Sequence, residues 1–427
     1  MSQGCSVGPA RRGSTRELWA WPGVLAAVLL ALPAVAPLAA PGVPDTYDLP
    51  FHVARMVELR DAIATGNLFP RWVQPFVGGL GFPFFNFYPP LAYYLATSLT
   101  LTGLSVIVAY KLAAALSVLL ASVAMCAWMV EVLKEAGASK KQQWCSALGA
   151  SAAYVYAPYF LTDIYRRGAL PESLGLALLP AMFLSFEKLL RRPRLESVPL
   201  AALSMAALVL AHNVASVLGV ALVALYTGSS FVASKLVPRA DGFHVSARRT
   251  VGYSALAAGL GLGASAFVWL PLLMERDYLA ATFQFLQSGL FDTEARLADS
   301  WPPLQFSPVY DYGEMYDDWG QLYRAGLVQV LAALIGLGLL VHTRRRRVGV
   351  WPGEAGLAGR VLFFALAALA LTSSLSPLFG VVWRAPILTS FQFPWRVQGA
   401  VVLATAFLTG AGLYWLSDRW PRAFPGI

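Results

Sequence analysis

Charged residues are scarce in this chain of 427 residues, and their scarcity excludes an ordinary soluble protein. Asp, Glu, Lys and Arg together make up 13% of the sequence, whereas hydrophobic residues make up 57%. The mean hydropathy of +0.59 points the same way. A soluble domain usually carries about 25% charged residues. The composition therefore predicts a membrane protein with several transmembrane segments.

Cysteine and histidine are also scarce, and their placement argues against two kinds of site. The cysteines are expected in the inner tail, within a helix and at an inner helix end, so the sequence predicts neither a disulfide framework nor a zinc site. They are Cys5, Cys126 and Cys145. The four histidines divide between the two sides of the membrane, so no three of them meet at one metal. His52 and His212 are expected outside, and His244 and His342 inside.

The sequence contains long runs of hydrophobic residues. A hydrocarbon core about 30 Å thick takes roughly 20 apolar residues per helical crossing. The runs predict an all-α, polytopic transmembrane helical bundle of about ten helices. One run is too long for a single crossing and is divided at His212-Asn213. The expected segments are 18–40, 105–133, 144–161, 170–190, 197–212, 214–233, 250–273, 323–342, 358–377 and 396–416.

Basic residues are unevenly distributed over the loops. With the N-terminus inside, most of the 32 Lys and Arg residues flank the inner ends of helices. Because such residues stay on the cytoplasmic side, we expect cytoplasmic tails at 1–17 and 421–427 and a single transmembrane domain at 18–420 in the plasma membrane. The net charge of +9 is then an inner-face excess facing anionic lipid, and no nucleic-acid partner is expected.

The first segment has a second interpretation. Basic residues precede an apolar stretch that ends in the small residues Ala34-Val35-Ala36, as in a cleavable secretory signal. A retained helix is favoured, because the stretch is long for a signal core and because cleavage would detach the helix that positions the next loop. Both interpretations deliver residue 45 to the outer side.

The first outer loop, 41–104, holds a group of ionisable residues at the membrane edge. A helix starting at Asp48 would set Asp48, His52 and Arg55 on one face, at i, i+4 and i+7. Its apolar residues predict an interfacial helix. The simpler alternative is that Asp48 only caps the helix before Pro50. Asp45 and Asp48 are a thin ligand set for a divalent ion, so metal binding stays open, and no other cofactor is expected.

Other outer segments extend this picture. The aromatic stretch 84–94 has the ring density of an interfacial segment, either beside a ligand or as a membrane anchor alone. The outer loop 275–322 combines acidic and aromatic residues and is interpreted as an acceptor lid, with a disordered, solvated loop as the alternative. Charged residues at outer helix ends predict a pocket at the membrane surface. They are Asp163, Arg166, Arg167, Glu172, Glu275, Arg276, Arg384 and Arg396.

Several motifs are familiar from one bacterial family. They are Asp48-Leu-Pro-Phe-His52-Val-Ala-Arg55, Gly66-Asn-Leu-Phe-Pro70-Arg-Trp72, Gly81-Phe-Pro-Phe-Phe-Asn-Phe-Tyr-Pro-Pro90, Arg167-Gly-Ala-Leu-Pro-Glu172, Ala211-His-Asn213, Val268-Trp-Leu-Pro271 and Phe391-Gln-Phe-Pro-Trp-Arg396. Over roughly residues 45–400 the chain resembles the bacterial membrane family labelled 6-pyruvoyl-tetrahydropterin synthase-related. The soluble synthase in that label is a small α/β enzyme with a three-histidine zinc site, which this chain cannot build, so the pterin activity is set aside.

The layout is also similar, more weakly, to GT-C glycosyltransferases such as protein mannosyltransferases and the lipid A aminoarabinose transferase. Those enzymes carry an acidic residue after the first membrane helix, an Arg two turns on and a Pro-Pro-aromatic stretch before the second helix. The matching positions are Asp48, Arg55 and Tyr88-Pro89-Pro90. This resemblance implies transfer of a sugar from a polyprenyl-phosphate carrier to an acceptor on the outer face.

Such a reaction suggests roles for the outer residues. An inverting transfer needs a carboxylate base, for which Asp48 is the first candidate and Asp45 the reserve, while His52 would orient Asp48 or the acceptor. The leaving lipid phosphate needs cations, which guanidinium groups supply bidentately. The expected phosphate ligands are Arg55, Arg166, Arg167, Arg384 and Arg396, and the expected pocket includes Tyr88, Glu172, His212 and Asn213.

Each role has an alternative. Arg396 beside Trp395 is also explained as a snorkelling membrane anchor, and Arg166-Arg167 as ion-pair partners of Asp163 and Glu172. The rival function is a non-enzymatic membrane protein that binds or transports a lipid-linked saccharide with the same pocket.

Overall fold

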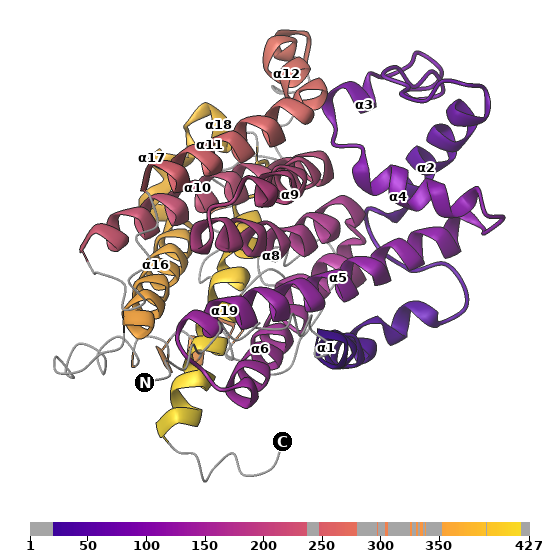
Figure 1. Cartoon of the computed structure of the whole chain (residues 1–427). Coiled ribbons are helices and arrows are strands. Elements are labelled where there is room, and N and C mark those ends of the chain that lie inside the picture. Colours follow the sequence, from indigo (N-terminus) through magenta and orange to yellow (C-terminus); the bar gives the residue numbers. More distant parts are fainter. Residues whose placement is uncertain are drawn as a thin grey trace, which may run out of the picture.

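The computed structural model describes residues 20–236, 247–279, 352–389 and 391–419, together with isolated positions between 297 and 338. Within them the chain is an all-α helical bundle of the multi-pass membrane type, as the hydrophobic runs predict (Figure 1). β-Structure in these residues is limited to one isolated bridge and a two-residue parallel pairing of β1 (Leu304–Gln305) with β2 (Ala325–Gly326).

In chain order, the described helices are α1 (Ala20–Val35), α2 (Leu49–Ala64), α3 (Phe84–Phe87), α4 (Leu91–Thr100), α5 (Val106–Glu135), α6 (Lys140–Val155), α7 (Pro158–Thr162), α8 (Leu170–Arg191), α9 (Val198–Ala211), α10 (Asn213–Leu236), α11 (Ala247–Ala264), α12 (Ala266–Met274), α16 (Pro352–Ser374), α17 (Gly380–Trp383), α18 (Pro386–Thr389) and α19 (Gln398–Arg419). A π-helical turn, Asp163–Arg167, connects α7 to α8.

Six of the described helical segments are long and apolar enough to cross a membrane, and the pair α11–α12, bent by 71°, makes a seventh if it forms one span. The six are Pro22–Ala39, Val106–Glu135, Leu170–Arg191, Asn213–Val232, Gly356–Ser374 and Pro394–Ser417. The hydrophobic runs predict about ten. The difference has local causes: Pro158 starts a new helix after α6, and α9 has 14 residues, a length of about 21 Å. The expected segment 323–342 lies largely outside the described residues.

Helix α5 is central to the bundle. It packs against α1, α6 and α8, while α19 packs against α6 and α16. Fully buried alanines on α5, among them Ala113 and Ala121, let neighbouring backbones approach closely, as membrane helices require. Farther along α5 the Trp128 ring lies 4.9 Å from the Phe183 ring and 5.1 Å from the Phe407 ring. These rings fill the space between α5, α8 and α19.

The helices α2, α3 and α4 lie together at one end of the bundle, to the right in Figure 1. We call this the outer end, following the orientation that the basic residues predict. The bend between α11 and α12 has an evident cause: the Ser265 hydroxyl donates to the carbonyl of Gly261, and Ser265 is not helical. As a result α12 turns away from α11 and packs beside α3.

A buried ion network closes the opposite end. Arg360 of α16 is 7% exposed, and its Nη2 donates to Glu135 and Glu187, at 2.6 Å each. Its Nε donates to the hydroxyl of Tyr226 at 2.9 Å, and Arg191 Nε lies 3.8 Å from Glu135. The sequence predicts Arg360 near the inner end of the segment 358–377, and the structure places it in α16, which begins at Pro352. A buried charge is costly without a partner, so these pairs tie α16 to α5 and α8.

Replacing Arg360 with alanine is expected to lower the free energy of unfolding by about 3–5 kcal/mol, because Glu187 would stay buried without its cation. The control Arg194→Ala breaks an exposed pair with Glu196 and should change stability little. Thermal unfolding of the detergent-solubilised protein, followed by circular dichroism, measures both. Equal melting temperatures for the two variants would contradict a stabilising role for the network.

Candidate functional site

The loop before α2 is tied by its backbone to the π-helical turn. The amide of Asp48 donates to the carbonyl of Arg167 at 2.7 Å, and the amide of Tyr47 donates to the carbonyl of Arg166 at 3.2 Å. Gly168 ends the turn with a φ of +70°, and Thr46 Oγ1 lies 2.2 Å from where a Cβ would stand. Only glycine fits both requirements without strain. The sequence Arg167-Gly-Ala thus brings the first outer loop against the start of α8.

Asp48 starts α2 without capping it. Its side chain makes no capping hydrogen bond to the first turn, although Pro50 stands in the first turn as expected. The carboxylate instead lies 3.4 Å from Nη2 of Arg167, and the side chain is 35% exposed. The alternative that Asp48 serves only as an N-cap is therefore wrong. Its carboxylate is both oriented by a cation and open to the surroundings.

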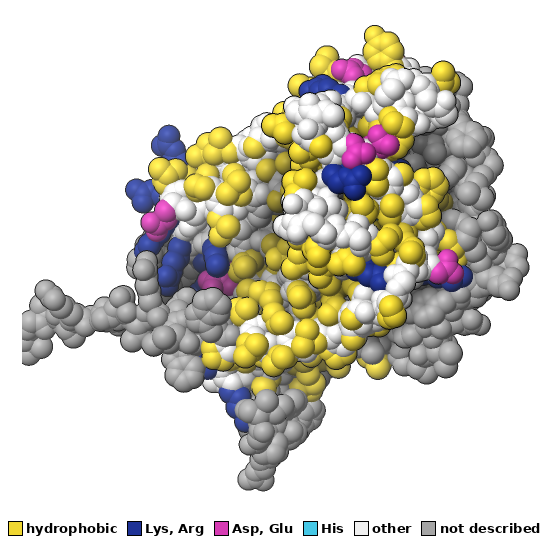
Figure 2. Space-filling view, turned by 90° about the vertical axis from the view of Figure 1, so that its right-hand side faces the viewer, with side chains coloured by type: hydrophobic (Ala, Val, Ile, Leu, Met, Phe, Trp, Pro, Cys, Tyr) yellow, Lys and Arg dark blue, Asp and Glu magenta, His cyan; other side chains and the backbone are white. Residues whose placement is uncertain are grey.

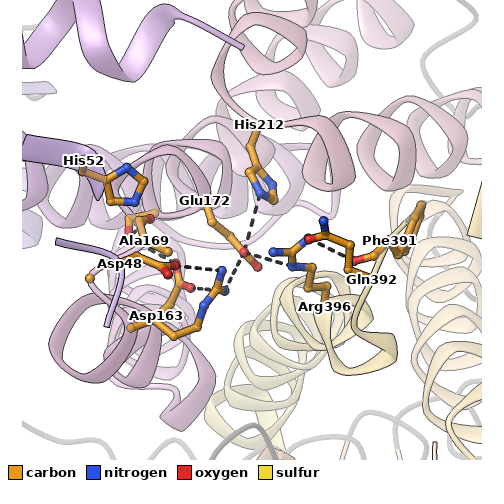
Figure 3. Close-up of polar contacts among 12 residues, drawn as sticks. Asp48, His52, Asp163, Ala169, Glu172, His212, Phe391, Gln392 and Arg396 are labelled. Carbon is orange, nitrogen blue, oxygen red and sulfur yellow. Dashed lines mark hydrogen bonds and ion pairs between the residues drawn. The ribbon is translucent and has the colours of Figure 1, made fainter. Parts of the chain in front are cut away.

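Arg167 joins three carboxylates. Its Nη1 donates to Asp163 at 2.8 Å and to Glu172 at 2.7 Å, while Nη2 faces Asp48 (Figure 3). Asp163 is fully buried and Glu172 is 3% exposed. The predicted pairing of Arg167 with Asp163 and Glu172 is confirmed. Because two of its three partners are buried, this guanidinium is held in one orientation.

Glu172 brings two further segments to the same point. Arg396 Nε, from the turn before α19, lies 3.7 Å from Glu172 Oε2, and His212 Nε2, between α9 and α10, lies 3.6 Å away. The hydroxyl of Tyr159 also donates to Glu172. Arg396 Nη1 donates to the carbonyl of Phe391 at 2.9 Å, so its guanidinium points inward and does not snorkel outward. We call Asp48, Asp163, Arg167, Glu172, His212 and Arg396 the outer charge cluster.

The outer charge cluster holds more carboxylates than guanidiniums. Three carboxylates face Arg167 and Arg396, so one negative charge is in excess when all are ionised. Burial and the neighbouring Glu172 raise the pKa of Asp163 well above its usual range, against the pull of Arg167. Asp163 is therefore the member that carries a proton most readily.

A second polar group adjoins this cluster. Arg55 Nη1 donates to the hydroxyl oxygen of Tyr93 at 3.0 Å, and that oxygen lies 2.8 Å from Nδ1 of His52. The Tyr93 oxygen accepts from Arg55, and its bond with Nδ1 runs in the direction that the tautomer of His52 sets. Nε2 is buried and has no hydrogen-bond partner among the described residues.

His52 is neutral near pH 7 because it is buried close to positive charges. The residue is 2% exposed, and burial with the positive charges of Arg55 and Arg167 nearby holds its pKa well below the ordinary value of about 6.5. His212 adds a smaller effect of the same sign.

Arg55 differs from Arg167 and Arg396 in its partners. Its guanidinium carbon lies 4.2 Å from the centre of the Phe84 ring and 5.5 Å from that of Tyr88, as cation–π contacts. In the part of the chain that the structure describes, it forms no ion pair with a carboxylate. Burial raises the pKa of Tyr88, which also senses the charges of Arg55, Arg396, Asp48 and Arg167. Tyr88 thus links the two polar groups.

The aromatic stretch 84–94 differs from the expected membrane anchor. Phe84, Phe85 and Tyr93 are 6%, 0% and 0% exposed, so these rings face the interior. They surround Arg55 and Tyr88 rather than a headgroup surface. Ring density alone does not distinguish an interfacial belt from an aromatic wall, because both require large rings next to polar groups.

Four predicted site residues lie outside these contacts. Asp45 is exposed and, among the described residues, forms no ion pair with the outer charge cluster. Arg384 is exposed at the end of α17. The Arg166 guanidinium lies 5.0 Å from the centre of the Tyr47 ring. Asn213 starts α10, where its carbonyl accepts from the Ser216 hydroxyl at 2.6 Å.

Sequence reasoning missed two members of the site, Tyr93 and Tyr159, which it did not single out. Asp163 was predicted to line an outer pocket and to pair with arginines, but it was not among the residues given a catalytic or binding role. A signal for Asp163 exists in its i, i+4 spacing to Arg167, which permits an ion pair on one helical face. The expected lid, 275–322, lies almost entirely outside the described residues. Among the residues described, no group of three or more His, Cys, Asp or Glu is placed to hold a metal ion.

Comparison with protein families gives one match. Residues 3–426 match the model described as "Family of unknown function (DUF6541)", and the chain belongs to that family. No curated protein matches the chain.

The pH dependence of stability tests the environment of His52. The unfolded chain binds a proton at His52 near pH 6.5, whereas the folded chain does so only at much lower pH. Because the unfolded state then holds more protons, the contribution of His52 to the free energy of unfolding should fall as the pH drops below about 6.5. His52→Asn keeps a polar group near the Nδ1 position but does not titrate, so it should remove this contribution and leave those of Asp163, whose pKa is raised, and of His212, whose pKa is lowered. Melting curves of both proteins between pH 7.5 and 5 measure the difference, with the same pH dependence in both proteins as the contradicting result.

Proposed function

We propose that this member of the family of unknown function is an integral membrane glycosyltransferase of the GT-C type. It would transfer a sugar from a polyprenyl-phosphate donor to an acceptor hydroxyl at the outer face. One observation carries the proposal: Asp48 is a partly exposed carboxylate, held 3.4 Å from Arg167 at the edge of a buried charge cluster. The resemblance of Asp48, Arg55 and Tyr88-Pro89-Pro90 to the corresponding GT-C positions supports it.

Asp48 is the base in this proposal. It takes the proton of the acceptor hydroxyl while the acceptor oxygen bonds to the anomeric carbon. At the same time the bond from that carbon to the donor phosphate breaks, and the lipid phosphate leaves with the electron pair. Asp163 and Glu172 are unsuited to this step, because they are 0% and 3% exposed and already engage Arg167.

Arg55 is the favoured ligand of the leaving phosphate. Arg167 and Arg396 already face carboxylates, so an added phosphate would have to compete with these ion pairs. Arg55 is held by the neutral Tyr93 and by aromatic rings, which leaves its charge for an anion. Asp48 and Arg55 are seven residues apart, or about 10 Å along the axis of α2, so base and phosphate ligand occupy different positions along this helix.

The orientation that this function needs agrees with the distribution of charge. In Figure 2 Lys and Arg side chains gather at the left-hand edge, and hydrophobic side chains cover a broad surface beside them. Basic residues near helix ends favour the cytoplasmic side. We therefore propose that the protein lies in the plasma membrane with both termini in the cytoplasm. Asp48 then faces the outer side, where polyprenyl-linked sugars are used.

Asp48→Asn should abolish sugar transfer in reconstituted membranes, with a loss of about 10²–10⁴-fold, because the amide accepts no proton at neutral pH. Asp45→Asn is the matched control, since Asp45 is an exposed carboxylate three residues away and should leave transfer intact. Radiolabelled polyprenyl-phosphate sugars extracted from membranes serve as donors. Full transfer by Asp48→Asn removes Asp48 as the base. Donor binding without any transfer by the wild type favours the rival function of binding or transport.

Arg55→Lys should lower kcat while donor binding changes less, because a guanidinium gives the leaving phosphate two hydrogen bonds as its charge grows, and an ammonium gives a point charge. Arg55→Met should lose more, about 10²–10³-fold. Arg60→Lys is the control on the same helix, where Arg60 pairs with Asp61 at the surface. Steady-state transfer assays separate kcat from KM. Normal kcat in Arg55→Met would exclude Arg55 from the phosphate site.

A further inference from the structure

The loop that connects α2 to α3 exposes large apolar side chains. In residues 67–82, which we call the apolar loop, Leu68 is 68% exposed, Trp72 54%, Val77 61% and Leu80 77%. Scattered apolar residues on a surface are ordinary, but several within one short loop indicate a contact surface. None of these four side chains has a role in the proposed sugar transfer.

The apolar loop is almost free of charge. Arg71 is its single charged residue, and Nη1 of Arg71 donates to Oδ1 of Asn86 at 3.1 Å, within the protein. An extramembrane loop of this length in water normally carries several charged side chains. Several exposed apolar residues with a single charge among them, which is hydrogen-bonded back to Asn86, are typical of a segment in contact with hydrocarbon.

The exposed side chains are held in place by the loop itself. Val73 and Phe82 exchange two backbone hydrogen bonds, at 2.9 and 3.0 Å, and the amide of Gly81 donates to the carbonyl of Phe76 at 2.9 Å. Gly81 has a φ of +86°, and the Trp72 indole lies 2.1 Å from where a Cβ would stand. Only glycine allows that indole to pack there.

Val77 adds backbone strain at the tip. Its φ is +55°, a conformation that β-branched residues rarely adopt. Such strain is costly and persists where the surroundings stabilise it. The strained conformation leaves the Val77 side chain 61% exposed. Burial of this side chain by an external apolar phase would offset part of the cost.

The apolar loop continues the surface of a membrane-spanning element. The Phe69 ring lies 5.4 Å from the Phe267 ring of α12, edge to face. Asn86 accepts the hydrogen bond from Arg71, and its Nδ2 donates to Oε2 of Glu275 at a distance of 2.8 Å. Glu275 directly follows α12. The last turn of α12 exposes Leu273 at 61% and Met274 at 74%. The loop and the outer half of the bent span α11–α12 therefore form one apolar surface.

We propose that the apolar loop inserts into the outer leaflet of the lipid bilayer. Continuity with α12 selects lipid as the occupant over a protein partner, because α12 is half of a candidate span. Each exposed apolar residue would then leave water, at about 25 cal/mol per Å² of buried apolar surface. Insertion holds the α2–α3 connection at a defined depth in the bilayer, and with it α2, which Asp48 precedes. The proposal does not depend on the sugar-transfer reaction.

Spin labels at single cysteines test the insertion in lipid nanodiscs. The labelled variants are Leu68→Cys and Leu80→Cys, and the controls are Arg60→Cys and Asp61→Cys on the exposed polar surface of α2, all in a chain without its three native cysteines. Exposed positions tolerate the label, so folding is not at risk. Power saturation of the EPR signal compares collisions with oxygen, which concentrates in hydrocarbon, and with a neutral nickel chelate, which stays in water.

The labels at Leu68 and Leu80 should favour oxygen over nickel by at least several-fold, while those at Arg60 and Asp61 should favour nickel. Two results would overturn the proposal. Nickel accessibility at Leu80 equal to that at Arg60 would place the loop in water. Protection of Leu80 from both reagents would place it against a protein, either a second copy or another partner.

Discussion

An ionised side chain inside a helical bundle must meet an opposite charge, and the outer end of this protein depends on that constraint. Arg167 meets it with Asp163, Glu172 and Asp48, which joins the loop before α2 to the turn after α7 and to the first turn of α8. Glu172 extends the pairing to Arg396, so the turn before α19 comes to the same point. Segments far apart in the sequence thus converge where their charges pair.

Helix α8 carries both ion networks of the described structure. Glu172 and Glu187 are fifteen residues apart, or about 22 Å along the helix. The inner network is closed: Glu187 is fully buried and Arg360 is 7% exposed. The outer charge cluster has one open edge, at Asp48, whose side chain is 35% exposed. Buried ion pairing therefore stabilises the helix packing at one end, and at the other end it leaves a carboxylate that a ligand can reach.

Local patterns predicted much of this protein. Low charge and long apolar runs predicted the all-α membrane bundle, because each span must satisfy its own backbone in hydrocarbon. The spacing of Asp48, His52 and Arg55 predicted α2, and the helix spans Leu49–Ala64. The crossing at 144–161 is a different case, since Pro158 divides it into α6 and α7. Hydropathy averages over a window and does not register such a break.

The sequence by itself determined the class of protein, the helix that carries Asp48 and the types of residue available at the outer end. Only the tertiary structure decided which arginine is already paired. Arg167 and Arg396 face carboxylates, whereas Arg55 rests on Phe84 and Tyr93, and the sequence spacing of these residues does not distinguish them. The physical reason is that hydropathy and helical register are properties of neighbouring residues, while ion pairing depends on distances between helices that only packing sets.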